Sequence, residues 1–251
     1  MIILEAKNLY KAFGKTQVIQ NLSFTIKEGE ITSIIGPNGA GKTTLFNLCT
    51  GQFRCNSGEI HYGGHRVDRL RTHQIVRLGI GRAFQICNIF PELTVFENIR
   101  IPVISHLRIG LHFLREAGTT ESVSELVFQI LENIGMLERK DHIAGKLDHG
   151  EMKLLDIGIA LSTEPRLLFL DEPTSGMTPD ERKRIMKLIE QVCIKKKITL
   201  VLIEHDMDVV FSISQEIKVL NHGQLVAEGA PEEISQNPQV VEAYLGESIA
   251  L

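Results

Sequence analysis

The N-terminal part of the chain alternates between strand patterns and tight turns. Apolar and polar side chains alternate over residues 22–26, which is the period of a strand buried on one face. A short apolar run, Ile31–Ile35, follows a charged turn and precedes a glycine-rich loop, which predicts a strand. Helical spacing begins at Lys42 and stops near Gly51, and residues 58–64 predict another strand with a Gly-Gly hairpin turn.

The middle of the chain changes to a helical period. Thr94 and Glu97 have the spacing of a capping box, which starts a helix. Apolar residues over 123–134 recur at helical spacing, and Gly135 stands where that helix should stop. The pattern therefore favours helices over most of residues 85–161.

Strand patterns return in the C-terminal part. They cover Leu167–Leu170, Ile198–Ile203 and Ile217–Leu220, and a helix is predicted over Pro179–Lys196. This order of elements predicts an α/β fold in which a strand-containing core brackets a helical insertion.

Composition narrows the class of protein. The 251 residues are 43% hydrophobic and 23% charged, which is typical of a soluble globular chain with one large α/β domain or a core with an inserted subdomain. The net charge is −4, and no run of like charges is longer than three residues, the length of Lys195–Lys197. Because duplex-binding proteins usually carry a basic excess or stripe, nucleic acid is not an expected partner.

Cysteine usage and hydropathy add two expectations. The chain has four cysteines, Cys49, Cys55, Cys87 and Cys193, and they form no CxxC pair. This favours buried free thiols in a reducing cytosol over disulfides or a metal framework. No signal-peptide pattern is visible, and the most apolar segment, Ile101–Leu114, is interrupted by Arg108. We therefore expect any membrane role to come through a partner.

One segment has the residues of a phosphate-binding loop. Residues 36–44, Gly36-Pro37-Asn38-Gly39-Ala40-Gly41-Lys42-Thr43-Thr44, fit the pattern GxxxxGK[ST] between a predicted strand and a predicted helix. Glycines let backbone N–H groups converge on phosphate oxygens, and the helix start adds a positive dipole. Lys42 would reach the β- and γ-phosphates, and the Thr43 hydroxyl can coordinate Mg²⁺. The alternative is a plain glycine-rich turn before a helix.

A second candidate lies at the end of the apolar strand predicted over residues 167–170. That strand runs into Asp171 and Glu172. One carboxylate can hold Mg²⁺ through water, and the other can orient or deprotonate an attacking water. A solvated strand end would have the same sequence, so the catalytic interpretation depends on the phosphate-binding loop.

The order of these motifs resembles the ABC ATPase family over essentially the whole chain. The resemblance implies an α/β fold: a P-loop NTPase core of the ABC ATPase type with an antiparallel β subdomain and an inserted helical subdomain. Residues 1–85 and 162–251 would form the nucleotide-binding core, and residues 86–161 the helical subdomain.

The same resemblance assigns roles to further residues. Phe13 would lie against the adenine of ATP, although a core Phe at a strand end is an open alternative. Gln85 would touch Mg²⁺ or its water, and His205 would contact the γ-phosphate. Asp171 would be the acid on the metal side and Glu172 the catalytic base.

Two motifs depart from the family. Leu147-Asp148-His149-Gly150-Glu151 stands where the family has Leu-Ser-Gly-Gly-Gln, which contacts the γ-phosphate of ATP held by the other subunit. Serine would donate a hydrogen bond there, whereas ionised Asp148 only accepts and repels the phosphate. Thr178 likewise replaces the acid of the family's Ser-Ala-Leu-Asp segment. Family drift without functional effect is the alternative for both departures.

Within the family, the chain looks most like branched-chain (hydrophobic) amino-acid importer subunits. This subgroup resemblance rests on residues 175–179, 203–207 and 242–247. ATPases of lipopolysaccharide exporters and urea importers have similar tails. The implied partners are integral-membrane permease subunits, a second ATP-binding subunit that is identical or different, and an extracytoplasmic solute-binding protein. The implied place is the cytoplasmic face of the inner membrane, as a peripheral protein.

Three other classes stay open. A non-transport ABC ATPase would share the motifs but not the tail. A different P-loop protein, such as a small kinase, would need a phosphate acceptor. A nucleotide-binding scaffold would not hydrolyse ATP, and Glu172 and His205 both favour hydrolysis.

Overall fold

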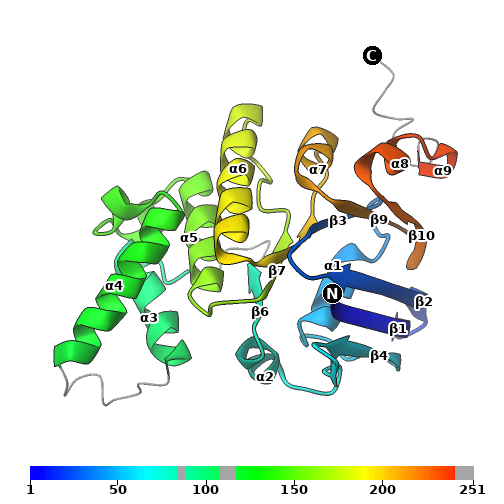
Figure 1. Cartoon of the computed structure of the whole chain (residues 1–251), viewed down its shortest axis with the longest axis horizontal. Helices are drawn as coiled ribbons and strands as arrows, with labels where there is room; N and C mark the ends of the chain where they lie inside the picture. The colour runs from blue at the N-terminus through cyan, green and yellow to red at the C-terminus, as the bar shows by residue number, and fades with distance from the viewer. Residues whose placement is uncertain (84–88, 108–116, 241–251) are drawn as a thin grey trace. The chain divides into compact units, whose positions relative to one another are not determined.

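The structure is a computed structural model that describes residues 1–83, 89–107 and 117–240 (Figure 1). The chain forms two compact units. Unit 1 comprises residues 1–75 and 199–251, and unit 2 comprises residues 76–198. Gln85 and Cys87 lie outside the described residues. Among the described residues, no helix has both the length and the apolar character needed to cross a membrane.

Unit 1 contains an antiparallel sheet built on a long hairpin. Strands β1 (Ile2–Phe13) and β2 (Thr16–Lys27) pair with each other, and β1 also pairs with β4 (Ser57–Tyr62). The short strand β5 (His65–Arg66) completes the order β2-β1-β4-β5. The alternation over residues 22–26 predicted only part of β2, because register shifts between β1 and β2 interrupt the period elsewhere.

The second sheet region of unit 1 is parallel at its centre. Strand β3 (Ile31–Ile35) lies between β8 (Thr199–Ile203) and β9 (Glu216–Asn221), parallel to both. Strand β10 (Gln224–Gly229) pairs with β9 in an antiparallel hairpin. All five residues of β3 and of β8 are buried, including the polar Thr32, Ser33 and Thr199.

Short helices complete unit 1. Helix α1 (Lys42–Cys49) follows β3, and α7 (Met207–Ile213) follows β8. Helices α8 (Pro231–Ser235) and α9 (Pro238–Val240) follow β10. A buried apolar cluster joins α7, α8 and α9 to strands β3 and β9: Ile35, Val210, Ile217, Val219, Ile234 and Val240. Helix α2 (Thr72–Arg77) spans the point where the chain passes from unit 1 to unit 2.

Unit 2 is mostly helical, as predicted for the middle of the chain. Its strands β6 (Ile80–Ala83) and β7 (Leu167–Asp171) pair in parallel. Its α-helices are α3 (Val95–His106), α4 (Ala117–Asn133), α5 (His149–Leu161) and α6 (Pro179–Lys196), and two 3-10 turns are η2 (Leu137–Arg139) and η3 (Ala144–Lys146).

Local sequence signals explain where these helices begin and end. The Thr94–Glu97 capping box is confirmed, since each side chain accepts a hydrogen bond from the other residue's backbone N–H. Gly135 follows α4 with a φ of 69°, as predicted for a helix stop. Helix α6 spans the predicted residues because Thr178 caps it and Pro179 opens it.

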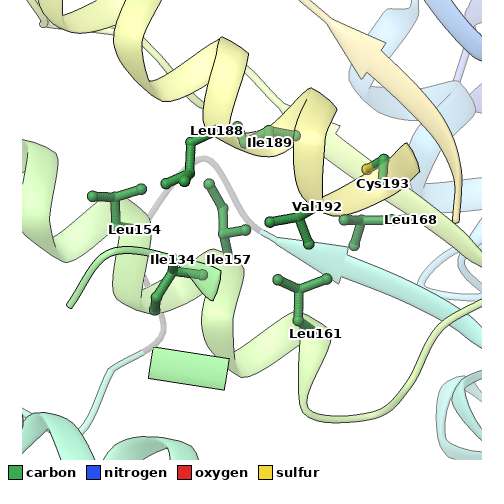
Figure 2. Close-up of a pocket in the computed structure, with 9 residues that line it drawn as sticks. All are labelled: Ile134, Leu154, Ile157, Leu161, Leu168, Leu188, Ile189, Val192 and Cys193. Carbon is green, nitrogen blue, oxygen red and sulfur yellow. The ribbon is translucent and has the colours of Figure 1, made fainter. Parts of the chain in front are cut away.

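A small cavity lies in the apolar core of unit 2 (Figure 2). Its lining comes from α5, α6, β7 and the segment after α4: Ile134, Leu154, Ile157, Leu161, Leu168, Leu188, Ile189, Val192 and Cys193. Burial raises the pKa of the Cys193 thiol to about 12, and the nearby Glu190 carboxylate adds to the effect. The prediction of buried free thiols is confirmed for Cys49 and Cys193, whereas Cys55 is only half-buried.

Candidate functional site

The phosphate-binding loop connects β3 to α1 and depends on its glycines. Gly36, Gly39 and Gly41 have φ values of 150°, 81° and 102°, which side-chain-bearing residues rarely adopt. A Cβ on Gly36 would lie 2.0 Å from the carbonyl oxygen of Leu220, on strand β9. The loop can therefore run this close to β9 only because Gly36 has no side chain.

The start of α1 suits an anion. Gly41 is the N-cap and makes no side-chain cap hydrogen bond. The first N–H groups of a helix have no partner within the helix, and the helix dipole is positive at that end. Thr43 is exposed in the first turn and Thr44 is half-buried, while Asn38 is exposed in the loop. A phosphate group fits this arrangement of donors.

Lys42 closes the loop on itself. Its Nζ donates hydrogen bonds to the carbonyl oxygens of Gly36, at 2.6 Å, and Pro37, at 3.1 Å. The Lys42 side chain is buried. Since a buried ammonium needs hydrogen-bond acceptors, these carbonyl groups hold the cation beside the residues that would cradle a phosphate.

A turn from another part of the sequence braces the loop. The N–H of Gly223, in the β9–β10 turn, donates to the carbonyl oxygen of Ala40 at 2.9 Å. The carbonyl oxygen of Gly223 accepts from the N–H of Gln20, on β2, also at 2.9 Å. A Cβ on Gly223 would lie 2.1 Å from the Val18 carbonyl oxygen. Gly223 therefore joins the phosphate-binding loop to β2 at a point where only glycine fits.

His205 lies in unit 1 between β8 and α7. Its side chain is exposed, and its backbone N–H donates to the carboxylate of the buried Glu204 at 3.1 Å. Asp206 caps α7 by accepting from the N–H groups of Asp208 and Val209. The cap fixes the backbone beside His205 and leaves its imidazole at the surface.

The two acids after β7 have different environments in unit 2. Asp171 is buried, and its carboxylate accepts from the Arg82 guanidinium at 3.3 Å. Glu172 is half-buried and has a φ of 50°, in the left-handed region that few non-glycine residues occupy. Such backbone strain gathers at functional sites. Sequence reasoning missed Arg82, which has no motif of its own.

The altered signature segment forms a complete helix cap. The Asp148 carboxylate accepts from the Glu151 N–H at 2.8 Å, and the Glu151 carboxylate accepts from the Asp148 N–H at 3.2 Å. Arg139 also forms an ion pair with Glu151 at 2.8 Å. Because aspartate caps a helix as well as serine does, the replacement keeps the start of α5.

The neighbouring residues of the signature are also placed within unit 2. His149 Nε2 lies 3.0 Å from the Ser175 carbonyl oxygen, which accepts when that nitrogen carries the proton. Gly150 lies in the first turn of α5, where a Cβ would be 3.4 Å from an Asp148 carboxylate oxygen. His149 thus connects the signature segment to the segment that contains Thr178.

Thr178 has a local role of the same kind. Its hydroxyl accepts from the Glu181 N–H at 3.4 Å and donates to the Glu181 carboxylate at 2.8 Å. The Thr178 N–H also donates to this carboxylate, at 2.9 Å, and together with the hydroxyl it holds the pKa of Glu181 below its usual value. Both departures from the family pattern are therefore helix N-caps in this structure.

Magnesium chemistry fits the residues present. The Thr43 hydroxyl and the Asp171 carboxylate are hard oxygen ligands of the kind that Mg²⁺ prefers. Within the part of the chain that the structure describes, no group of three or more His, Cys, Asp or Glu side chains could hold a metal ion.

Comparison with known protein families gives two matches. The model described as "ABC transporter" matches residues 19–175, more than half of the chain. A second model, described as "Branched-chain amino acid ATP-binding cassette transporter", matches residues 224–250.

Individual proteins and solved structures also match nearly the whole chain. The chain is 39% identical to the high-affinity branched-chain amino acid transport ATP-binding protein LivG of Salmonella typhimurium, over 98% of both chains. A crystal structure of an ATP-binding cassette in its ADP conformation has a TM-score of 0.84 and 31% identity, covering 98% of this chain and 99% of that one. A dimeric cassette bound to ADP and Pi has a TM-score of 0.78 and 25% identity, covering 91% and 99%.

Proposed function

The chain belongs to the ATP-binding subunits of ABC transporters, and we propose that it powers an importer of branched-chain or other hydrophobic amino acids. Its fold is the P-loop ABC ATPase fold, and its activity is ATP binding and hydrolysis coupled to transport. The solute class rests on relatives whose names specify branched-chain amino acids and on the matching C-terminal family model.

The observation that carries the function is the geometry of residues 36–44. This short loop contains three glycines with positive φ and leads into the start of a helix. It also contains the buried Lys42 ammonium. When ATP enters, the Lys42 ammonium exchanges the Gly36 and Pro37 carbonyl oxygens for phosphate oxygens. The backbone N–H groups between Gly36 and Thr43, except at Pro37, which has none, then hold the terminal phosphates in place.

The chemistry of hydrolysis needs a water nucleophile and compensation for charge. Glu172 orients the attacking water and takes its proton, and His205 supports the charge that spreads over the γ-phosphoryl group. Thr43, Asp171 and Gln85 are the residues that would hold Mg²⁺, which would neutralise charge on the phosphate oxygens. Phe13 stacks on the adenine.

Two such subunits act together with membrane permease subunits. The cassette dimerises, and each signature segment, here Asp148, His149, Gly150 and Glu151, faces the ATP held by the other subunit. Because Asp148 brings a negative charge where the family has a hydroxyl donor, it weakens the opposite site. A partner of different sequence with a standard signature would then make the two ATP sites unequal.

The remaining parts of the transporter follow from this assignment. Residues 1–85 and 162–251 form the nucleotide-binding core, and residues 86–161 form the helical subdomain that transmits closure through Gln85. The subunit sits at the cytoplasmic face of the inner membrane, and an extracytoplasmic solute-binding protein delivers the amino acid.

Calorimetry with the purified protein and Mg²⁺ tests the central claim. ATP and ADP should bind, and Lys42→Ala should abolish measurable binding; equally tight binding by this variant would refute the role of the loop. ATP hydrolysis without a phosphate acceptor separates the protein from a small kinase. Co-purification with multispanning proteins separates it from a non-transport ABC ATPase.

Reconstitution with the permeases and solute-binding protein then tests the solute. Leucine, isoleucine or valine should stimulate ATP hydrolysis and accumulate in vesicles. Stimulation by urea, or by a lipopolysaccharide precursor instead, would move the protein to one of those transport systems.

A further inference from the structure

Two phenylalanine rings lie together on the surface of unit 1. Phe13, at the end of β1, is 44% exposed, and Phe53, shortly after α1, is 37% exposed. Their centroids are 5.2 Å apart and their planes meet at 72°, an edge-to-face contact. This contact fixes the tilt of the Phe13 ring without burying it.

A lysine ammonium joins the pair. Lys11 Nζ lies 4.8 Å from the Phe13 centroid and 5.6 Å from the Phe53 centroid. It also donates a hydrogen bond to the Arg54 carbonyl oxygen at 2.9 Å, which holds the ammonium in this position. A cation over one face of a ring leaves the opposite face for a second partner.

The backbone around the pair is fixed by further hydrogen bonds. The Ala12 N–H donates to the Asn56 side chain at 2.7 Å, and the Asn56 N–H donates to the Tyr10 carbonyl oxygen at 2.8 Å. The Phe53 N–H donates to the carbonyl oxygen of Asn47, in α1, at 3.0 Å. The segment after α1 is therefore tied both to β1 and to the helix that starts at the phosphate-binding loop.

The pair is also within reach of a nucleotide on that loop. Phe13 pairs with Thr16 across the β1–β2 turn, and Val18 follows two residues later. A strand rises about 3.3 Å per residue, so Val18 is about 7 Å further along β2. The Val18 carbonyl oxygen lies 3.0 Å from the position of a Cβ on Gly41. Phe13 therefore lies within reach of a base that extends from phosphates at Gly41.

We propose that Phe53 and Lys11 are positioning residues for base recognition, which together hold the Phe13 ring so that one face is open to a purine. Phe53 sets the tilt of the ring from its edge, and Lys11 covers the other face. The inference rests on the proposed function, since it requires ATP to bind at the phosphate loop. It assigns these two residues to the Phe13 ring and gives them no part in holding the phosphates.

Calorimetry of the full chain with Mg²⁺ tests this, using ATP and inorganic tripolyphosphate as the two probes. Phe53→Leu and Lys11→Met should each raise the Kd of ATP roughly three- to tenfold, the size of effect that aromatic contacts have. The Kd of tripolyphosphate should not change. Phe128→Leu is the matched control, because Phe128 is also an exposed ring in contact with another Phe, in unit 2.

A double-mutant cycle separates positioning from general stability. In a Phe13→Ala background, Phe53→Leu should have no further effect on the Kd of ATP. An undiminished effect there, an unchanged Kd in the single variants, or equal weakening of both probes would overturn the inference. None of these three outcomes contradicts ATP binding at the loop. A parent protein that binds neither probe would refute both the proposed function and the inference.

Discussion

The backbone N–H of Gly223 donates to the carbonyl oxygen of Ala40 at 2.9 Å, across more than half of the sequence. Gly223 has a φ of 75°, and a Cβ there would lie 2.1 Å from the Val18 carbonyl oxygen. The β9–β10 turn can therefore approach the phosphate-binding loop only through this glycine. Its contact is with the loop that we propose to hold the nucleotide, but Gly223 belongs to no phosphate-binding motif.

Gly223→Ala should weaken both folding and ATP binding. The added methyl group must push the turn away from Val18, and backbone clashes of this kind cost about 1–3 kcal/mol. We expect a lower free energy of unfolding in urea and a higher Kd for ATP by calorimetry. Gly64→Ala is the control, because Gly64 has a φ of 82° but no atom within 4 Å of a Cβ. Equal losses in the two variants would mean that strain alone, and not the contact with the loop, explains the effect.

Glu172→Gln should bind ATP and lose most of its turnover. The amide keeps the size of the side chain but cannot take a proton from water, and general-base catalysis contributes about 10²–10⁴-fold. Steady-state phosphate release and nucleotide calorimetry on the same sample measure the two effects. Glu164→Gln serves for comparison, since Glu164 also has a positive φ, 48°, but is exposed at the end of a helical turn. Unchanged hydrolysis in Glu172→Gln would remove Glu172 from its proposed role.

Asp148→Ser and Asp148→Ala should have different effects because they separate capping from charge. Serine keeps the N-cap of α5, whereas alanine removes the acceptor for the Glu151 N–H and costs about 0.5–2 kcal/mol. In the complex with its partner ATPase, Asp148→Ser should raise the ATPase rate by removing a negative charge from the opposite site. Thermal unfolding and phosphate release measure these effects. A lower ATPase rate in Asp148→Ser would show that the Asp148 carboxylate promotes hydrolysis.

The Cys193 thiol should be unreactive in the folded protein. Burial raises its pKa to about 12, so almost no thiolate exists at pH 8. Iodoacetamide should modify Cys193 only after unfolding, while half-buried Cys55 reacts sooner; peptide mass spectrometry reads both sites. Rapid modification of Cys193 in the native protein would contradict its burial.

The same shift has a consequence for stability at high pH. The unfolded thiol deprotonates near pH 9, whereas the folded thiol holds its proton to about pH 12. The unfolded state is therefore favoured as the pH rises from 9 towards 12, and below pH 9 the group has no effect. The free energy of unfolding of a Cys193→Ala variant should fall less steeply over that range than the parent's.

Local signals in the sequence were enough to predict several elements. Helix α6 has the bounds predicted from the sequence, Pro179–Lys196, and the structure shows that Thr178 caps it and Pro179 opens it. The phosphate-binding loop was predicted because its glycines and its lysine act within nine neighbouring residues. The capping role of Asp148 was missed, although Asp148 and Glu151 have the spacing of a capping box.

Contacts between distant parts of the chain could not be predicted in the same way. Gly223 acts on Ala40, and Phe53 acts on Phe13, through packing that no short motif records. The ion pair between Arg82 and Asp171 has the same character, because β6 and β7 become neighbours only in the folded sheet. These residues surround the motif residues and decide how they are held.

The hydrogen bonds of Lys42 to Gly36 and Pro37 change how ATP binding by a Lys42→Ala variant should be interpreted. The Lys42 ammonium is already hydrogen-bonded to carbonyl oxygens of its own loop. A phosphate that binds there has to replace those oxygens as hydrogen-bond acceptors. Lys42→Ala therefore removes two hydrogen bonds within the loop as well as the proposed contact with phosphate. Part of any loss of ATP affinity in Lys42→Ala is then the free energy needed to order a loop that no longer has these hydrogen bonds.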